Sequence, residues 1–192
     1  MNKSRLEAFS DGVLAVILTI MVLEIHAPHG GTLAALAELC PALLAYVVSF
    51  GYVAIYWNNH HHLFHATRVI SGGIMWANLH LLFWLSLVPA TTAWVGQNPN
   101  APLPAALYGV VLMMAALAWL LLQHAIVAKN GRDSELAEAV GHDAKGKLSG
   151  ALYAVAIGLA FVHPWIADAI YAIVACLWIV PDPRIESRVI DA

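Results

Sequence analysis

The first hydrophobic stretch of the chain carries side chains that are rare inside a membrane span. It reads RLEAFSDGVLAVILTIMVLEI, so Arg5, Ser10 and Asp11 lie within or beside a long apolar run. An ionisable group there costs roughly 2.5 to 3.5 kcal/mol on insertion scales, and it therefore needs a partner or water. Two interpretations follow from the residues: Asp11 pairs with Arg5 and holds helices together, or Asp11 contacts a permeating ion.

The same stretch also presents an apolar stripe. On a helix, Val16, Ile20 and Leu23 share one face, while Asp11 lies more than about 100° away from them. If the stripe lines a pore, Asp11 points back into the surrounding helices. If Asp11 lines water instead, the stripe is packing or lipid contact, and spacing alone leaves both interpretations open.

Histidines gather near the end of the second hydrophobic stretch, at His60, His61, His62 and His65. Imidazole is a common metal ligand, and positions 61 and 65 are one helical turn apart. No carboxylate or cysteine lies nearby in sequence to complete a tetrahedral site, so we expect neither a metal nor another cofactor. The chain has no nucleophile motif and no glycine-rich phosphate loop, so we expect no enzyme activity.

Membrane helices are the elements that must position these residues. The chain has 192 residues, of which 61% are hydrophobic and 11% are charged, whereas about 25% charged is usual in a soluble domain. A net charge of -3 without a lysine and arginine cluster argues against nucleic acid as a partner. The composition therefore indicates a protein whose main partner is the lipid bilayer.

A bilayer core of about 30 Å requires roughly 20 apolar residues per helix, so this length accommodates six spans. Hydropathy and the polar, glycine and proline punctuation predict helices over 6–26, 36–57, 70–95, 103–128, 148–163 and 165–181. The fold class is thus all-α, a polytopic membrane protein forming a single domain over 1–192, with 129–147 as a cytoplasmic loop. His163-Pro164 separates the last two helices, and one long kinked helix is the alternative.

The distribution of positive charge predicts the orientation. The lysines and arginines of the chain are Lys3, Arg5, Arg68, Lys129, Arg132, Lys145, Lys147, Arg184 and Arg188. In a six-helix chain all of them lie on one side, which the positive-inside rule places in the cytoplasm together with both termini. The opposite side carries Glu24, Glu38 and Asp168, which would raise the local cation concentration there.

Several motifs together resemble one known family. They are Arg5-x-x-x-Phe9-Ser10-Asp11-Gly12, Tyr56-Trp57-x-x-His60-His61, Asn78-Leu79 and Leu87-Val88-Pro89. This set is similar to the signature of the transmembrane protein 175 family, which contains the lysosomal potassium channel and shorter prokaryotic relatives. The resemblance extends over nearly the whole chain, including its length and six-span plan.

The resemblance implies that the first helix of each subunit lines a central pore without a carbonyl filter, and the chain indeed contains no TVGYG-like segment. Carried over by distance from the motif, the hydrophobic constriction is Val16, Ile20 and Leu23, with the Thr19 hydroxyl beside it. Valine stands in the first layer, where isoleucine or leucine is usual in the family. The family also implies a structural polar network behind this helix, formed by Arg5, Phe9, Ser10, Asp11, Trp57, His60 and Asn78.

The predicted function is a potassium-preferring cation channel in the plasma membrane, formed by identical subunits. A single pore helix per subunit requires several copies around an axis, and the resemblance implies a homotetramer and potassium as the permeant ion. A proton-coupled secondary transporter, which uses Asp11 and the histidines as a relay, is the alternative. A structural membrane protein is the third class.

Overall fold

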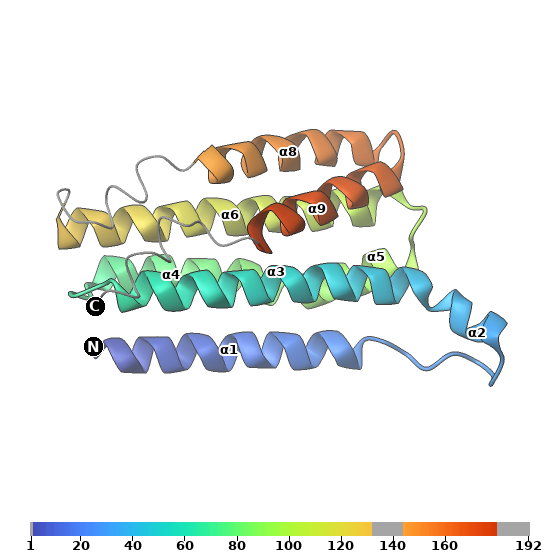
Figure 1. Cartoon of the computed structure of the whole chain (residues 1–192), viewed down its shortest axis with the longest axis horizontal. Helices are drawn as coiled ribbons and strands as arrows, with labels where there is room; N and C mark the ends of the chain where they lie inside the picture. Colours follow the sequence, from blue (N-terminus) through green and yellow to red (C-terminus); the bar gives the residue numbers. More distant parts are fainter. Residues whose placement is uncertain (1, 132–143, 180–192) are drawn as a thin grey trace.

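The computed structural model describes residues 2–131 and 144–179, and the regular structure within them is helical. In chain order the helices are α1 (Lys3–Leu23), α2 (Leu33–Glu38), α3 (Cys40–His65), α4 (Gly72–Ser86), α5 (Val88–Gln97), α6 (Pro102–Asn130), α8 (Ala144–Ala160) and α9 (Pro164–Ile179). All except the short α2 run roughly along the long axis of the molecule (Figure 1).

The helices form a bundle in which α6 is central. α6 packs against α4, α5, α8 and α9, while α1 packs on the other side of the bundle against α3, α4 and α5. α8 and α9 form an antiparallel hairpin (Figure 1). Pro164 is the first residue of α9, and proline suits that position because it has no N–H to leave unpaired. The last two helices are therefore a hairpin, and the single long kinked helix is excluded.

Four helical segments are long and apolar enough to cross a membrane. They are Lys3–Leu23, Cys40–His65, Gly72–Gln97 (α4 and α5 together) and Pro102–Asn130. α9 is also apolar but has only 16 residues, and α8 has 17. The chain is thus a multi-pass, all-helical membrane protein.

Two predicted helices differ from the observed ones. The second was predicted over 36–57, but residues 36–38 belong to α2, and α3 runs from Cys40 to His65. All four histidines of the cluster are therefore helical. The third was predicted to be continuous, but it breaks at Leu87 between α4 and α5. Pro89 causes this break because it has no N–H to bond to the carbonyl one turn earlier.

The predicted loop 129–147 lies largely outside the described residues. Its first two residues belong to α6, and residues 144–147 belong to α8. The described lysines and arginines lie where α1 and α8 begin, where α6 ends and between α3 and α4. They are Lys3, Arg5, Arg68, Lys129, Lys145 and Lys147. Arg132, Arg184 and Arg188 lie outside the described residues.

Buried hydroxyl groups connect α3, α5 and α6. The Ser49 hydroxyl of α3 lies 2.7 Å from Thr92 Oγ1 of α5 and 2.8 Å from the Tyr108 hydroxyl of α6. All three residues are buried. In lipid such bonds favour one helix register, because an unpaired hydroxyl has no water to bind.

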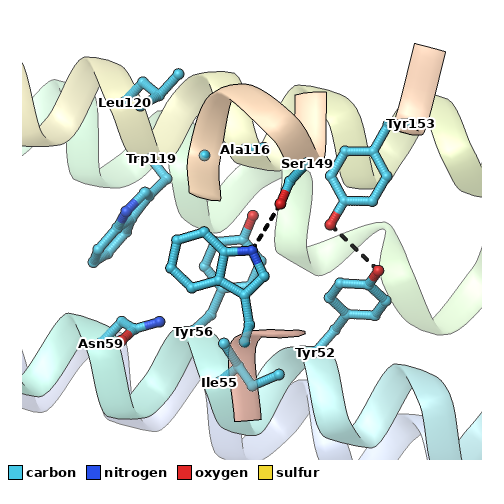
Figure 2. A pocket seen from close by; sticks show the side chains of 11 residues that line it. Tyr52, Ile55, Tyr56, Asn59, Ala116, Trp119, Leu120, Ser149 and Tyr153 are labelled. Atoms are coloured by element: carbon cyan, nitrogen blue, oxygen red, sulfur yellow. Dashed lines mark hydrogen bonds between the residues drawn. The ribbon is translucent and has the colours of Figure 1, made fainter. Parts of the chain in front are cut away.

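A tyrosine cluster continues this contact toward α8 and α9. The Tyr153 hydroxyl donates to the Tyr52 hydroxyl at 3.3 Å (Figure 2), and the Tyr52 hydroxyl donates to the Tyr171 backbone oxygen at 2.6 Å. The Tyr171 hydroxyl donates to the Ala105 backbone oxygen at 3.2 Å. It reaches that oxygen across Gly109, where a Cβ atom would overlap the tyrosine ring.

Candidate functional site

The first helix is attached to the bundle by one face only. Its N-terminus is capped by Asn2, whose side-chain oxygen accepts a hydrogen bond from the Ser4 backbone N–H at 3.3 Å. Its buried side chains recur at steps of three or four residues, as expected for one face of a helix. They are Leu6, Ser10, Leu14, Ile17 and Met21. The face that they form packs against the bundle, and the remaining faces of α1 stay open.

The residues predicted for the constriction lie on one of these open faces. Val16, Ile20 and Leu23 are 56%, 42% and 72% exposed in the single subunit. Thr19 is exposed as well, and its hydroxyl donates to the Ala15 backbone oxygen at 2.8 Å. That bond uses the hydroxyl proton and leaves the oxygen able to accept a further bond or to contact a cation.

The buried face of α1 carries a hydrogen-bonded chain of three polar side chains. The amide nitrogen of Asn78 in α4 donates to Ser10 Oγ at 2.9 Å, and Asn78 Oδ1 lies 2.8 Å from His60 Nε2 of α3. Ser10 in turn donates to the Leu6 backbone oxygen at 2.9 Å. Because Ser10 and Asn78 are fully buried and His60 nearly so, this chain joins α1, α3 and α4 where water cannot replace the bonds.

Asp11 follows Ser10 directly but is not part of these hydrogen bonds, and it contacts α3 separately. The indole N–H of Trp57 in α3 donates to Asp11 Oδ1 at 3.1 Å. Both side chains are exposed in the single subunit, with Trp57 at 51%. Asp11 therefore faces the seam between α1 and α3, away from the face that carries Val16.

Two predicted members of the network are not part of it in the subunit. The Arg5 side chain is exposed and forms no hydrogen bond or ion pair with the residues that the structure describes, and Phe9 is 53% exposed. The proposed pair of Arg5 with Asp11 is therefore absent within one subunit. Six residues correspond to a rotation of about 600° on a helix, which places the two side chains on different faces of α1.

The remaining histidines lie toward the end of α3. The ring centroids of His61 and His65 are 6.3 Å apart, and Lys3 Nζ donates to the His65 backbone oxygen at 3.0 Å. Nδ1 of His62 is buried without a hydrogen-bond partner among the described residues. Of the four histidines, His60 is the one that bonds to the chain of Ser10 and Asn78.

Comparison with known proteins places this arrangement in a family. The chain is 50% identical over 186 residues to a potassium channel of Chryseobacterium sp. (strain P1-3), and the match covers 97% of each chain. The sequence profile of the family described as "Endosomal/lysosomal potassium channel TMEM175" matches residues 5–89. The chain belongs to the TMEM175 family. The matched range includes the whole of the Ser10, Asn78 and His60 chain and Asp11 with Trp57.

Two further relatives extend the TMEM175 assignment over most of the chain. A potassium channel of Streptomyces collinus (strain DSM 40733 / Tue 365) is 34% identical, with 91% of each chain covered. The crystal structure of a lysosomal potassium-selective channel TMEM175 homologue from Chamaesiphon minutus superposes with a TM-score of 0.81 at 27% identity. It covers 93% of this chain and 96% of that one. The sequence resemblance to the family is thus confirmed.

The hydroxyl cluster of Ser49, Thr92 and Tyr108 was not identified from the sequence. Each residue was visible as a polar position within an apolar run. Polar side chains in membrane helices commonly bond across helices, which is a signal that could have been used. The choice of partners, however, depends on the rotation of three helices about their axes, and the sequence alone does not determine it.

Proposed function

We propose that this chain is one subunit of a potassium-conducting cation channel whose central pore is lined by α1 of each subunit. The observation that carries the proposal is the division of α1 into a polar, buried face and an exposed apolar stripe. Ser10 accepts a hydrogen bond from Asn78 of α4 and Asp11 accepts one from Trp57 of α3. These bonds hold α1 on α4 and α3, while Val16, Ile20 and Leu23 remain uncovered. Membership in a family with relatives named potassium channels supports the same function.

The proposed constriction is built from the stripe. In a symmetric assembly each position repeats around the axis, so Val16, Ile20 and Leu23 form three stacked apolar rings with Thr19 beside them. Such a constriction gates by excluding water, and ions pass when it widens. No chemical conversion is required, so the protein has no need of catalytic residues or a cofactor.

The proposed assembly is a homotetramer in the plasma membrane. Asp11 and Trp57 support the need for further subunits, because an exposed carboxylate in a membrane span is costly unless another helix or water covers it. In this arrangement α8 and α9 complete six spans in a single domain over 1–192. Seventeen residues rise about 26 Å, which is near the lower limit for a span.

The proposed orientation places both termini and the loop 129–147 in the cytoplasm. The described lysines and arginines cluster at that end of the bundle, as the positive-inside rule requires. Glu24 follows α1 directly and Glu38 ends α2, so both acidic groups are at the other end, near the proposed outer mouth. Their charge raises the local concentration of cations and disfavours anions.

A proton-coupled transporter is less consistent with the contacts. A relay would require bonded steps between Asp11 and the histidines. Asp11 instead bonds to the Trp57 indole, and His60 bonds to Asn78. The indole is a donor only and cannot pass a proton onward.

Ion flux through the purified protein in liposomes tests the proposal. We expect a potassium gradient alone to drive fast, passive flux, with a smaller flux under an equal sodium gradient. Protein-free liposomes and a subunit trapped as a monomer serve as controls, and neither should conduct. Flux that saturates and depends on a proton gradient would identify a transporter, and the absence of flux from assembled protein would refute conduction.

A further inference from the structure

A cavity near the outer end of the bundle contains a carboxylate that lies apart from α1 and its proposed constriction. It lies between α3, α5, α6 and α9, and its volume is about 210 Å³. One ordered water requires roughly 10 to 15 Å³ of such a cavity, so this cavity is large enough for a small organic molecule. Asp168 of α9 is part of its lining, and most of the other lining side chains are apolar or aromatic.

Asp168 has no counter-charge in the described part of the chain. Its carboxylate forms no hydrogen bond or ion pair with a described residue, and the residue is only partly exposed. The described lysines and arginines lie toward the opposite end of the bundle, where α1 and α8 begin, where α6 ends and between α3 and α4. A carboxylate that is removed from water and has no ionic partner is costly. A cation that entered the cavity would therefore be attracted to Asp168 without competition from a described lysine or arginine.

The lining indicates which kind of cation fits. Trp165, Tyr108 and Tyr171 contribute aromatic rings, which attract a cation over the ring face, most strongly where water is excluded. A bare alkali ion needs several oxygen ligands to replace its hydration shell. The hydroxyls of Tyr108 and Tyr171 already bond to Ser49 and to a backbone oxygen, so they are poorly placed to supply these ligands.

We propose that this cavity binds an organic ammonium ion with an apolar body. The ammonium group pairs with the Asp168 carboxylate and lies against the aromatic rings, while the hydrocarbon part contacts Leu44, Val48 and Val95. Two sources carry this chemistry: a free hydrophobic amine, or the amine headgroup of a membrane lipid. The site is separate from α1, none of whose residues lines it.

Equilibrium binding to the full chain in nanodiscs tests the proposal. Phosphatidylglycerol nanodiscs are suitable because this lipid contains no ammonium group. The probes are radiolabelled benzyltrimethylammonium and its uncharged carbon isostere, neopentylbenzene. We expect the ammonium ion to bind more tightly than the isostere, and Asp168→Asn to weaken ammonium binding about tenfold or more. Equal affinity of wild type and Asp168→Asn would overturn the proposal.

Two further variants separate charge from shape and folding. Glu38→Gln removes another carboxylate from the same end of the protein but outside the cavity, and it should bind the probe like the wild type. Ala169→Phe keeps Asp168 but fills the cavity, and it should abolish binding. Binding that persists in Ala169→Phe, or that is lost in Val16→Asn but not in Asp168→Asn, would place the ammonium elsewhere and refute the site.

Adding phosphatidylethanolamine to the nanodiscs distinguishes the two sources. Competition with the probe that disappears in Asp168→Asn would assign the site to the lipid amine. Undiminished probe binding at high phosphatidylethanolamine content would assign it to a free amine.

Discussion

The substitution Asn78→Ala tests whether the buried polar chain holds α1 against the bundle. Asn78 is fully buried and makes two side-chain hydrogen bonds, at 2.9 Å to Ser10 and 2.8 Å to His60. Leaving a buried group unpaired costs about 1 to 3 kcal/mol in soluble proteins. Bonds between membrane helices average only about 0.6 kcal/mol and reach about 1.7. With two bonds lost, we expect the free energy of unfolding to fall by about 1 to 3 kcal/mol.

The assay is the unfolding free energy of the purified protein in mixed detergent micelles. Asn98→Ala is the matched control, because Asn98 is exposed and, among the residues that the structure describes, its side chain bonds only to the Trp94 backbone oxygen one turn earlier. A double-mutant cycle with Ser10→Ala isolates the pair, and we expect the two losses to be non-additive by about 0.5 kcal/mol or more. If Asn78→Ala were as stable as Asn98→Ala, the hydrogen bonds between Ser10, Asn78 and His60 would not contribute to holding α1 against the bundle.

Two contacts and the predicted topology can be tested in the same way. Gly109→Ala should destabilise the protein by about 1 to 3 kcal/mol in the same assay, because the added Cβ would overlap Tyr171. Gly158→Ala, where a Cβ meets no atom within 4 Å, should be neutral or mildly stabilising, and equal effects would contradict this packing. Asp11→Ala should reduce assembly, measured by size-exclusion chromatography, more than it changes ion selectivity, since it removes the bond to Trp57. A well-assembled variant with altered ion preference would instead place Asp11 in the pore. Tags at residues 1 and 192 should both be protected from protease added outside cells, and an accessible C-terminal tag would contradict an even number of spans.

The parts of the fold that were predictable from sequence follow from local rules. α1 was expected over 6–26 and is observed at Lys3–Leu23, because Asn2 caps its start and no proline interrupts its apolar run. The turn before Pro164 was also predictable from local sequence, because proline favours the first position of a helix. The end of α3 was not predictable by hydropathy, because its last turns contain a polar run of asparagine and histidine. Those turns are stabilised by tertiary contacts, such as the burial of His60 and Phe64.

The candidate site was predictable in composition but not in every contact. The angular difference between Asp11 and the Val16 face follows from helix geometry and agrees with the bond from Trp57 to Asp11. The pairing of Arg5 with Asp11 within one subunit was wrong. Their opposite charges suggested it, but their spacing places them on different faces of α1. The Asp168 cavity was invisible because it requires residues from four helices to meet.

Cation flux through stripe variants in liposomes tests the central claim most directly. Val16→Asn and Ile20→Asn place a polar ring in the proposed constriction, so both should raise cation flux and reduce the preference for potassium over sodium. Val155→Asn is the matched control: Val155 is 54% exposed on α8, close to the 56% of Val16. It should leave conduction unchanged. If properly assembled Val16→Asn and Ile20→Asn conducted like the wild type, or if Val155→Asn had the same effect as they do, α1 would not form the constriction.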